Sequence, residues 1–242
     1  MGDISRRDLF LGGAASLLPL DFPQDKRRLK ILCAGGHPDD PESGAGGTMA
    51  RFADQGHEAV NLYFTRGEGG IPGKTGEEAA AIRSAEAEKA CGILKTRAIF
   101  AGQIDGASEV NAVRYEEIRK ILADEKPDLV LTHWPIDTHR DHRAISMLIL
   151  DGWHRTGRKF ALYFFEVNMG AQTSTFHPTH FVDISSTVDR KKEACYAHQS
   201  QNPPGFYDKY HEPMHKHRGM EANVKVAEAF VRHAQSRIEP LP

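Results

Sequence analysis

The chain has 242 residues, of which 40% are apolar and 26% are charged, a balance typical of a globular protein with enough chain to bury a substantial core. Its formal net charge of -2 argues against a protein that binds nucleic acid or an anionic membrane surface. We therefore expect one sizeable α/β domain and no nucleic-acid partner.

The N-terminal residues differ in character from the rest of the chain. Ser5-Arg6-Arg7-Asp8 precedes an apolar run from Leu9 to Leu20, which resembles a twin-arginine export signal. The run is shorter than the ~20 residues that a spanning helix needs, so we expect no stable membrane span. We expect residues 1–28 to be a signal and polar linker of an exported, periplasmic protein. The alternative is an N-terminal helix that packs on the domain of a cytoplasmic protein.

Strand and helix patterns alternate from residue 29 onward. Apolar runs predict strands at residues 29–34, 58–65, 98–101, 128–131, 160–167 and 180–184. Periodic apolar spacing and end signals predict helices at 48–53, 77–94, 112–125 and 141–154, and one more that Ser185 or Ser186 caps. This alternation predicts an α/β fold with a Rossmann-like, mostly parallel sheet flanked by helices. The glycines at 44, 46 and 47 do not form a Gly-x-Gly-x-x-Gly fingerprint, which disfavours a dinucleotide cofactor.

A polar cluster follows the first predicted strand, in the sequence Gly35-Gly36-His37-Pro38-Asp39-Asp40. His37 and Asp40 offer nitrogen and oxygen donors at a separation that a tight turn can bring onto one metal ion. Asp39 is then free to face a bound water. The alternative is a turn without a metal, in which an aspartate or Ser43 caps the next helix. A glycine-rich segment at 43–47 leads into that helix.

A second polar cluster follows the strand predicted at 128–131. It contains three histidines and two aspartates, namely His133, Asp137, His139, Asp141 and His142. Ligand groups collect at the carboxyl ends of strands in α/β sheets, so two such clusters at equivalent positions indicate one shared site. Together they supply the mixed imidazole and carboxylate donors that catalytic zinc uses with an open coordination position.

With both clusters identified, the chain resembles the PIG-L/LmbE-like zinc-dependent N-deacetylases. The family pattern is His-Pro-Asp-Asp-Glu after the first strand and His-x-Asp-His later. Both halves occur here, and the resemblance extends from about residue 29 to about residue 233, including residues 65–68, 83–86, 197–201 and 227–230. There are three departures: Pro41 replaces the family glutamate with Glu42 one place later, Arg140 replaces a frequent proline, and Asp137 stands where some members have a tyrosine.

The resemblance implies a role for each residue of the two motifs. His37, Asp40 and His142 bind one divalent metal, Zn²⁺, although Fe²⁺ and Co²⁺ suit the same donors. Asp39 is the general base. His139 stabilises the tetrahedral intermediate or protonates the leaving amine, and Asp141 orients His139.

Four further residues are candidates for substrate binding. The resemblance places Arg66 and Glu68 at the rim of the pocket, although their glycine-rich loop could consist only of turns. Arg83 would reach a substrate hydroxyl, or it could pair with Glu86 on a solvated helix face. Asp105, at the end of a strand, would accept a hydrogen bond from a sugar hydroxyl or cap a turn.

The function implied by the resemblance is hydrolysis of an N-acetyl group from an N-acetylglucosamine-type amino sugar or glycoconjugate. The first alternative is an amidase that acts on a thiol-sugar conjugate. The second is a protein that binds metal or carbohydrate without turnover. A carboxylate at Asp39, next to a ligand but not needed as one, argues against mere binding.

The segment 202–217 is rich in histidine, proline and tyrosine. Taken by itself, it reads as a histidine-rich surface patch. In the family the corresponding part often covers the site or meets a neighbouring subunit. The oligomeric state is therefore left undecided by the sequence, and a homo-oligomer is one of the alternatives.

Cellular location can be tested with the paired arginines. Changing Arg6 and Arg7 together to lysine keeps the charge and removes the feature that a twin-arginine signal requires. We expect cell fractionation to find the parent in the periplasm and the double variant in the cytoplasm. Equal cytoplasmic retention of both proteins would favour the packed N-terminal helix instead.

Overall fold

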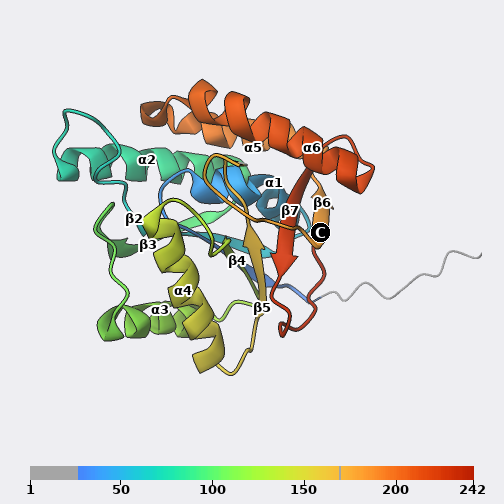
Figure 1. Cartoon of the computed structure of the whole chain (residues 1–242), viewed down its shortest axis with the longest axis horizontal. Coiled ribbons are helices and arrows are strands. Elements are labelled where there is room, and N and C mark those ends of the chain that lie inside the picture. Colours follow the sequence, from blue (N-terminus) through green and yellow to red (C-terminus); the bar gives the residue numbers. More distant parts are fainter. Residues whose placement is uncertain (1–26, 169) are drawn as a thin grey trace, which may run out of the picture.

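The computed structural model describes residues 27–168 and 170–242, so nearly all of the expected signal and linker lies outside the described residues. Within these residues one seven-stranded sheet lies between two layers of helices (Figure 1). No helix of this part is long and apolar enough to cross a membrane. The predicted α/β fold class is confirmed.

The predicted alternation is confirmed for six strands and five α-helices, whereas a seventh strand and a sixth α-helix near the C-terminus were not predicted. The strands are β1 (Lys30–Gly35), β2 (Glu58–Thr65), β3 (Arg97–Gln103), β4 (Leu129–His133), β5 (Ala161–Phe165), β6 (His180–Asp183) and β7 (Ala227–Arg232). The α-helices are α1 (Asp40–Asp54), α2 (Gly76–Leu94), α3 (Ala112–Glu125), α4 (Arg140–Arg155), α5 (Val188–Ala197) and α6 (Glu212–Ala222). A short 3₁₀-helix, η1 (Gln199–Gln201), and a π-helical segment, η2 (Pro204–His211), connect α5 to α6.

The strand order is β3-β2-β1-β4-β5-β7-β6. β1 to β5 are parallel, and β7 runs antiparallel to both β5 and β6. The chain proceeds outward from β1 to β3 and then crosses back to β4, which makes the β1–β4 boundary the topological switch point. In such sheets ligands bind outside the carboxyl ends of the strands at this boundary.

The two sheet faces have separate cores because successive strand residues point to opposite faces. Leu32 of β1 packs in a buried cluster with residues of α3 and α4, such as Ile145. Its neighbour Cys33 packs in a second cluster with Met49 of α1. Figure 1 shows α3 and α4 on one side of the sheet and α1, α2, α5 and α6 on the other.

The glycine-rich segment 43–47 is helical, contrary to the expectation that the first helix starts near residue 48. α1 begins at Asp40, and the segment is its buried second turn. A Cβ atom at Gly44 would lie 2.3 Å from the Phe165 ring, and one at Gly47 would lie 2.7 Å from Ile184. These glycines therefore allow α1 to approach the sheet closely, at a moderate cost in helix propensity.

The prediction that residues 202–217 form a surface patch is wrong for two of its histidines. His211 and His215 are each only 1% exposed. They lie on η2 and α6, and the His215 Nε2 atom lies 2.9 Å from the ammonium of Lys191 on α5. His217, in contrast, is largely exposed.

The close packing of α1 can be tested with two glycines that occupy opposite environments. Gly44→Ala should destabilise the protein by about 1–3 kcal/mol, because the added methyl group overlaps the Phe165 ring. The matched control is Gly92→Ala in α2, where an added Cβ meets nothing within 4 Å and better helix propensity should stabilise by about 0.5–1 kcal/mol. Urea unfolding of both variants measures these changes. Equal stabilities would contradict the packing role of Gly44.

Candidate metal centre and active site

The two predicted clusters meet at the carboxyl ends of β1 and β4. They line a cavity of about 360 Å³, at the lower end of the range for small-molecule sites. Seven of the predicted residues line it directly: His37, Asp39, Asp40, Arg83, Asp105, His139 and His142. The structure therefore brings together side chains from β1–α1, α2, the loop after β3, and β4–α4.

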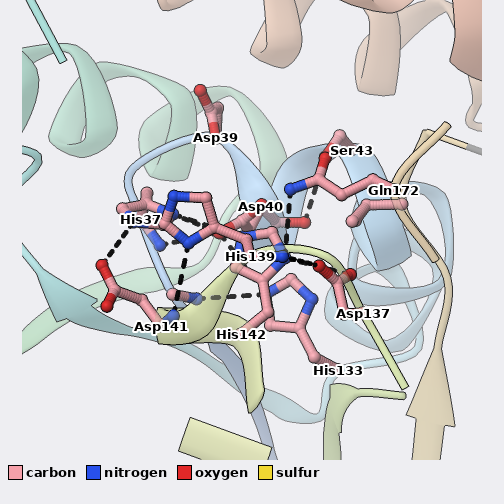
Figure 2. A network of polar contacts seen from close by, with 12 residues as sticks. His37, Asp39, Asp40, Ser43, His133, Asp137, His139, Asp141, His142 and Gln172 are labelled. Atoms are coloured by element: carbon pink, nitrogen blue, oxygen red, sulfur yellow. Dashed lines mark hydrogen bonds and ion pairs between the residues drawn. The ribbon is translucent and has the colours of Figure 1, made fainter. Parts of the chain in front are cut away.

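The predicted ligand atoms form a nearly equilateral triangle. Asp40 Oδ2 lies 3.2 Å from His37 Nδ1 and 3.1 Å from His142 Nε2, and the two nitrogens are 3.3 Å apart (Figure 2). Two atoms bonded to one tetrahedral zinc ion at ~2.0–2.1 Å are separated by ~3.3–3.4 Å. The donor types and their spacing therefore fit a divalent metal.

Carboxylates contact the outer nitrogen of each histidine in the triangle. His37 Nε2 lies 3.1 Å from Asp141 Oδ2 and 3.2 Å from Asp105 Oδ1. His142 Nδ1 lies 3.2 Å from Asp137 Oδ2. Such partners hold the proton on the outer nitrogen and leave the inner lone pair for a metal.

The charges around His142 favour a cation. Burial by itself lowers the pKa of the imidazole, but the negative charge of Asp40 and the hydrogen bond to Asp137 outweigh burial and raise the pKa of His142 to about 9. The negative charge that stabilises a proton there equally stabilises a metal ion.

Asp141 has a different partner from the one expected. Its carboxylate contacts His37 and accepts a hydrogen bond from the Gly106 backbone N–H at 2.8 Å, whereas its backbone N–H donates to His139 Nδ1 at 3.3 Å. The first turn of α4 directs this side chain toward the loop after β3. Asp141 therefore contacts His139 through its backbone N–H, whereas its carboxylate contacts the predicted ligand His37.

Asp39 stands apart from the cluster of rings in Figure 2 and has an unusual backbone. It directly precedes α1 and has a φ of 116°. Within the described residues its side chain makes no capping hydrogen bond to α1, so Asp39 does not have the capping role that the alternative interpretation of this turn gave to an aspartate. Arg83 Nη2 donates to Asp39 Oδ2 at 3.0 Å and to the Pro38 carbonyl at 2.5 Å. Burial raises the pKa of Asp39 to about 6, with Arg83 opposing the rise.

Two of the four predicted substrate-binding residues line the cavity and two do not. Arg83 and Asp105 line it, whereas Arg66 and Glu68 brace the adjoining loop. Glu68 accepts hydrogen bonds from the backbone N–H groups of Arg66 and Asp105, both at 3.2 Å. Arg83 pairs with Asp39 rather than with Glu86, whose carboxylate binds Ser200.

Sequence reasoning assigned no role to several residues of the site. The His133 ring stacks on His142 at a centroid distance of 3.8 Å, and its Nε2 accepts from the Gly36 N–H. Gln172, whose Nε2 lies 3.4 Å from His142 Nδ1, comes from a loop without a recognisable motif. Glu42 lies buried below the site and accepts a hydrogen bond from Asn61 at 3.0 Å. His133 carried a signal in the sequence because it lies within the second cluster, and Glu42 carried one because it stands one place after the position of the family glutamate.

The triangle generates a prediction about metal binding. His37→Ala should abolish stoichiometric binding of one divalent metal, because it removes one of three ligands. Asp137→Asn should weaken the metal affinity by about 10- to 100-fold, since it removes the negative charge behind His142. Metal analysis and competition with a chelator measure both effects. The matched control is Asp151→Asn on the outer part of α4, which should bind metal like the parent. Undiminished metal in His37→Ala would contradict the assignment.

The chain is similar to several known proteins. The family model described as PIG-L, GlcNAc-PI de-N-acetylase, matches residues 32–152. The diacetylchitobiose deacetylase of Thermococcus kodakarensis is 31% identical over 194 residues, covering 74% of this chain and 72% of the relative. The solved structure of the N,N'-diacetylchitobiose deacetylase from Pyrococcus horikoshii has a TM-score of 0.74 at 26% identity, covering 86% of this chain and 85% of that one.

The same fold also occurs in a protein with another described reaction. The 4-carboxy-2-hydroxymuconate hydratase GalB from Pseudomonas putida KT2440 has a TM-score of 0.76 at 22% identity, covering 88% of this chain and all of that one. Likeness at that identity shows the fold alone, so activity has to be argued from the site. The extent of the family match and the similarity to the Thermococcus enzyme are decisive for membership: the chain belongs to the PIG-L family of de-N-acetylases.

Proposed function

We propose that the protein is a metal-dependent hydrolase that removes the N-acetyl group from an N-acetylglucosamine-type amino sugar or glycoconjugate. The observation that carries this proposal is the ligand triangle of His37, Asp40 and His142, with the Asp39 carboxylate and the His139 ring lining the same cavity. The described activities of the Thermococcus and Pyrococcus relatives support the same reaction.

The metal would be held by the ligand triangle, and zinc is the ion we propose. When bound there, it lowers the pKa of water toward ~7 and polarises the amide carbonyl. Asp105 and Asp141 hold the His37 ring in place through its outer nitrogen. These contacts keep the geometry of the site rigid during turnover.

Asp39 acts as the general base. A pKa of about 6 leaves most of its carboxylate ionised at pH 7, so it can accept a proton from the attacking water. Arg83 fixes the carboxylate and the preceding carbonyl in one position. The proton then passes to the amine leaving group.

His139 stabilises the oxygen of the tetrahedral intermediate. Because its Nδ1 accepts the Asp141 backbone N–H, the proton of the neutral ring is on Nε2. Burial and the neighbouring His37 and His142 lower the pKa of His139, which keeps the ring neutral. A neutral N–H donor can stabilise the developing oxyanion, while the amine takes its proton from Asp39.

We also propose that residues 29–242 form the deacetylase domain and that residues 1–28 direct its export to the periplasm. This location rests on the paired arginines and the short apolar run. Two other activities serve as outcomes of a substrate screen: an amidase would act on a thiol-sugar conjugate, and a binding protein would release no amine.

Substitution of Asp39 separates an enzyme from a binding protein. Asp39→Asn keeps the size of the side chain but removes the basic oxygen, so kcat should fall by about 10²- to 10⁴-fold while metal content stays at the parent level. His139→Ala should behave in the same way. The assay is amine release from N-acetylglucosamine and N,N'-diacetylchitobiose by purified, metal-loaded protein.

The control for this experiment is Asp124→Asn, an exposed carboxylate on α3 that should leave kcat unchanged. Loss of metal in Asp39→Asn would make Asp39 a ligand instead of a base. Normal turnover in that variant would remove the base from the mechanism.

A further inference from the structure

The cavity has two walls of opposite character. We call Arg83, Asp105 and the Arg83-bound Asp39 the charged wall. We call Val167, Asn168, Gln172, Phe206 and His211 the neutral wall. Arg83 and Asp105 come from α2 and the loop after β3, whereas the neutral wall comes from the loop after β5 and from η2. Since β3 and β5 lie on opposite sides of the β1–β4 pair, the walls flank the ligand triangle from opposite sides.

The charged wall is built to bind hydroxyl groups. Asp105 is half-buried and offers carboxylate oxygens beside His37 and Gly69. The Arg83 side chain is 4% exposed, and its buried Nε has no hydrogen-bond partner among the described residues. A polyhydroxylated ring can form hydrogen bonds with these charged groups, whereas a methyl group placed against them would displace their water without replacing it, and that loss costs more for charged groups than for neutral ones.

The neutral wall offers apolar surface and carries no charged side chain, although the buried Asn168 Oδ1 and His211 Nδ1 atoms have no hydrogen-bond partner among the described residues. Val167 is 1% exposed and belongs to the buried cluster that contains Cys33 and Met49. The Asn168 amide donates to Gln172 Oε1 at 2.7 Å, and the Asn168 backbone N–H donates to His211 Nε2 at 3.4 Å.

His211 is uncharged at neutral pH, although it is a histidine. Burial and the nearby Lys191 lower the pKa of its imidazole to about 3. The Phe206 ring lies edge-on to it, with centroids 6.3 Å apart. The wall therefore presents no net charge to a group bound against it, and contact with a small apolar group removes apolar area from water.

The family resemblance already places sugar hydroxyls at Arg83 and Asp105. From the asymmetry of the walls we propose that the acyl group of the substrate lies against the neutral wall, across the ligand triangle from the sugar. Val167 and Phe206 then limit the acyl group to about the size of acetyl. This inference rests on the proposed function, because it assigns the two ends of the amide that the site would cleave. It makes Val167 and Phe206 the residues that determine acyl specificity.

The experiment compares two ratios of kcat/KM in the metal-loaded protein. The acyl ratio compares N-butyrylglucosamine with N-acetylglucosamine, and the sugar ratio compares N-acetylglucosamine with N-acetylcyclohexylamine. We expect Val167→Ala and Phe206→Ala each to raise the acyl ratio by about 10-fold or more, since one methylene in a pocket changes kcat/KM by about 10- to 200-fold. Both should leave the sugar ratio unchanged. Asp105→Asn should do the reverse, lowering the sugar ratio and leaving the acyl ratio unchanged.

Each outcome bears on one proposal. An acyl ratio that responds to Asp105→Asn but not to Val167→Ala or Phe206→Ala overturns the orientation, as does an acyl ratio that no variant changes. Failure of the parent to release amine from any of these substrates contradicts the proposed function instead. Thermal unfolding and metal content of each variant are measured alongside. Phe206, which is half-buried, gives a second reading of the acyl ratio if Val167→Ala does not fold.

Discussion

The site depends on the contacts of a single oxygen atom, Oδ2 of Asp40. It accepts the His37 backbone N–H at 2.7 Å and lies within 3.4 Å of ring nitrogens of His37, His133 and His142. These partners come from β1 and from β4–α4, so one carboxylate joins the two halves of the sheet at the switch point. Burial would raise its pKa, but His142 and His133 outweigh burial and keep it ionised. An ionised oxygen among convergent nitrogens is the arrangement that a divalent cation completes.

The position of Asp40 depends in turn on how α1 is held. Lys191 of α5 is fully buried, and its three protons go to the Ser43 carbonyl at 2.7 Å, to His215 Nε2 at 2.9 Å and to Glu228 of β7. Glu228 also accepts the backbone N–H groups of residues 47 and 48. A buried ion pair is tolerated only when its hydrogen bonds are complete, as they are here. The C-terminal elements thereby fix the helix that carries Asp40.

The fold by itself does not specify which reaction the protein catalyses, and the residues of the cavity restrict the possible reactions and substrates. GalB shares this fold, so the parallel sheet and its switch point do not specify deacetylation. We propose that the chemistry is specified by the convergence of three predicted ligands, a carboxylate held by Arg83, and a histidine whose tautomer is set by a backbone N–H. In the orientation that we propose, the loops after β3 and β5 present different surfaces to the two ends of a substrate. Loops can differ in their side chains in this way because the stability of the sheet that positions them does not depend on the loop sequences.

The sequence by itself determined the strand and helix alternation and the two clusters that hold His37, Asp40 and His142. These follow from local periodicity and from residue types at strand ends, which neighbouring residues encode. Only the tertiary structure decided that the Asp141 carboxylate faces His37, that Arg83 clamps Asp39, and that residues 43–47 are helical. It also placed His211 inside the cavity, although its segment reads as surface. Each of these outcomes depends on contacts between residues far apart in the chain, and no local spacing in the sequence specifies which side chain a distant element will meet.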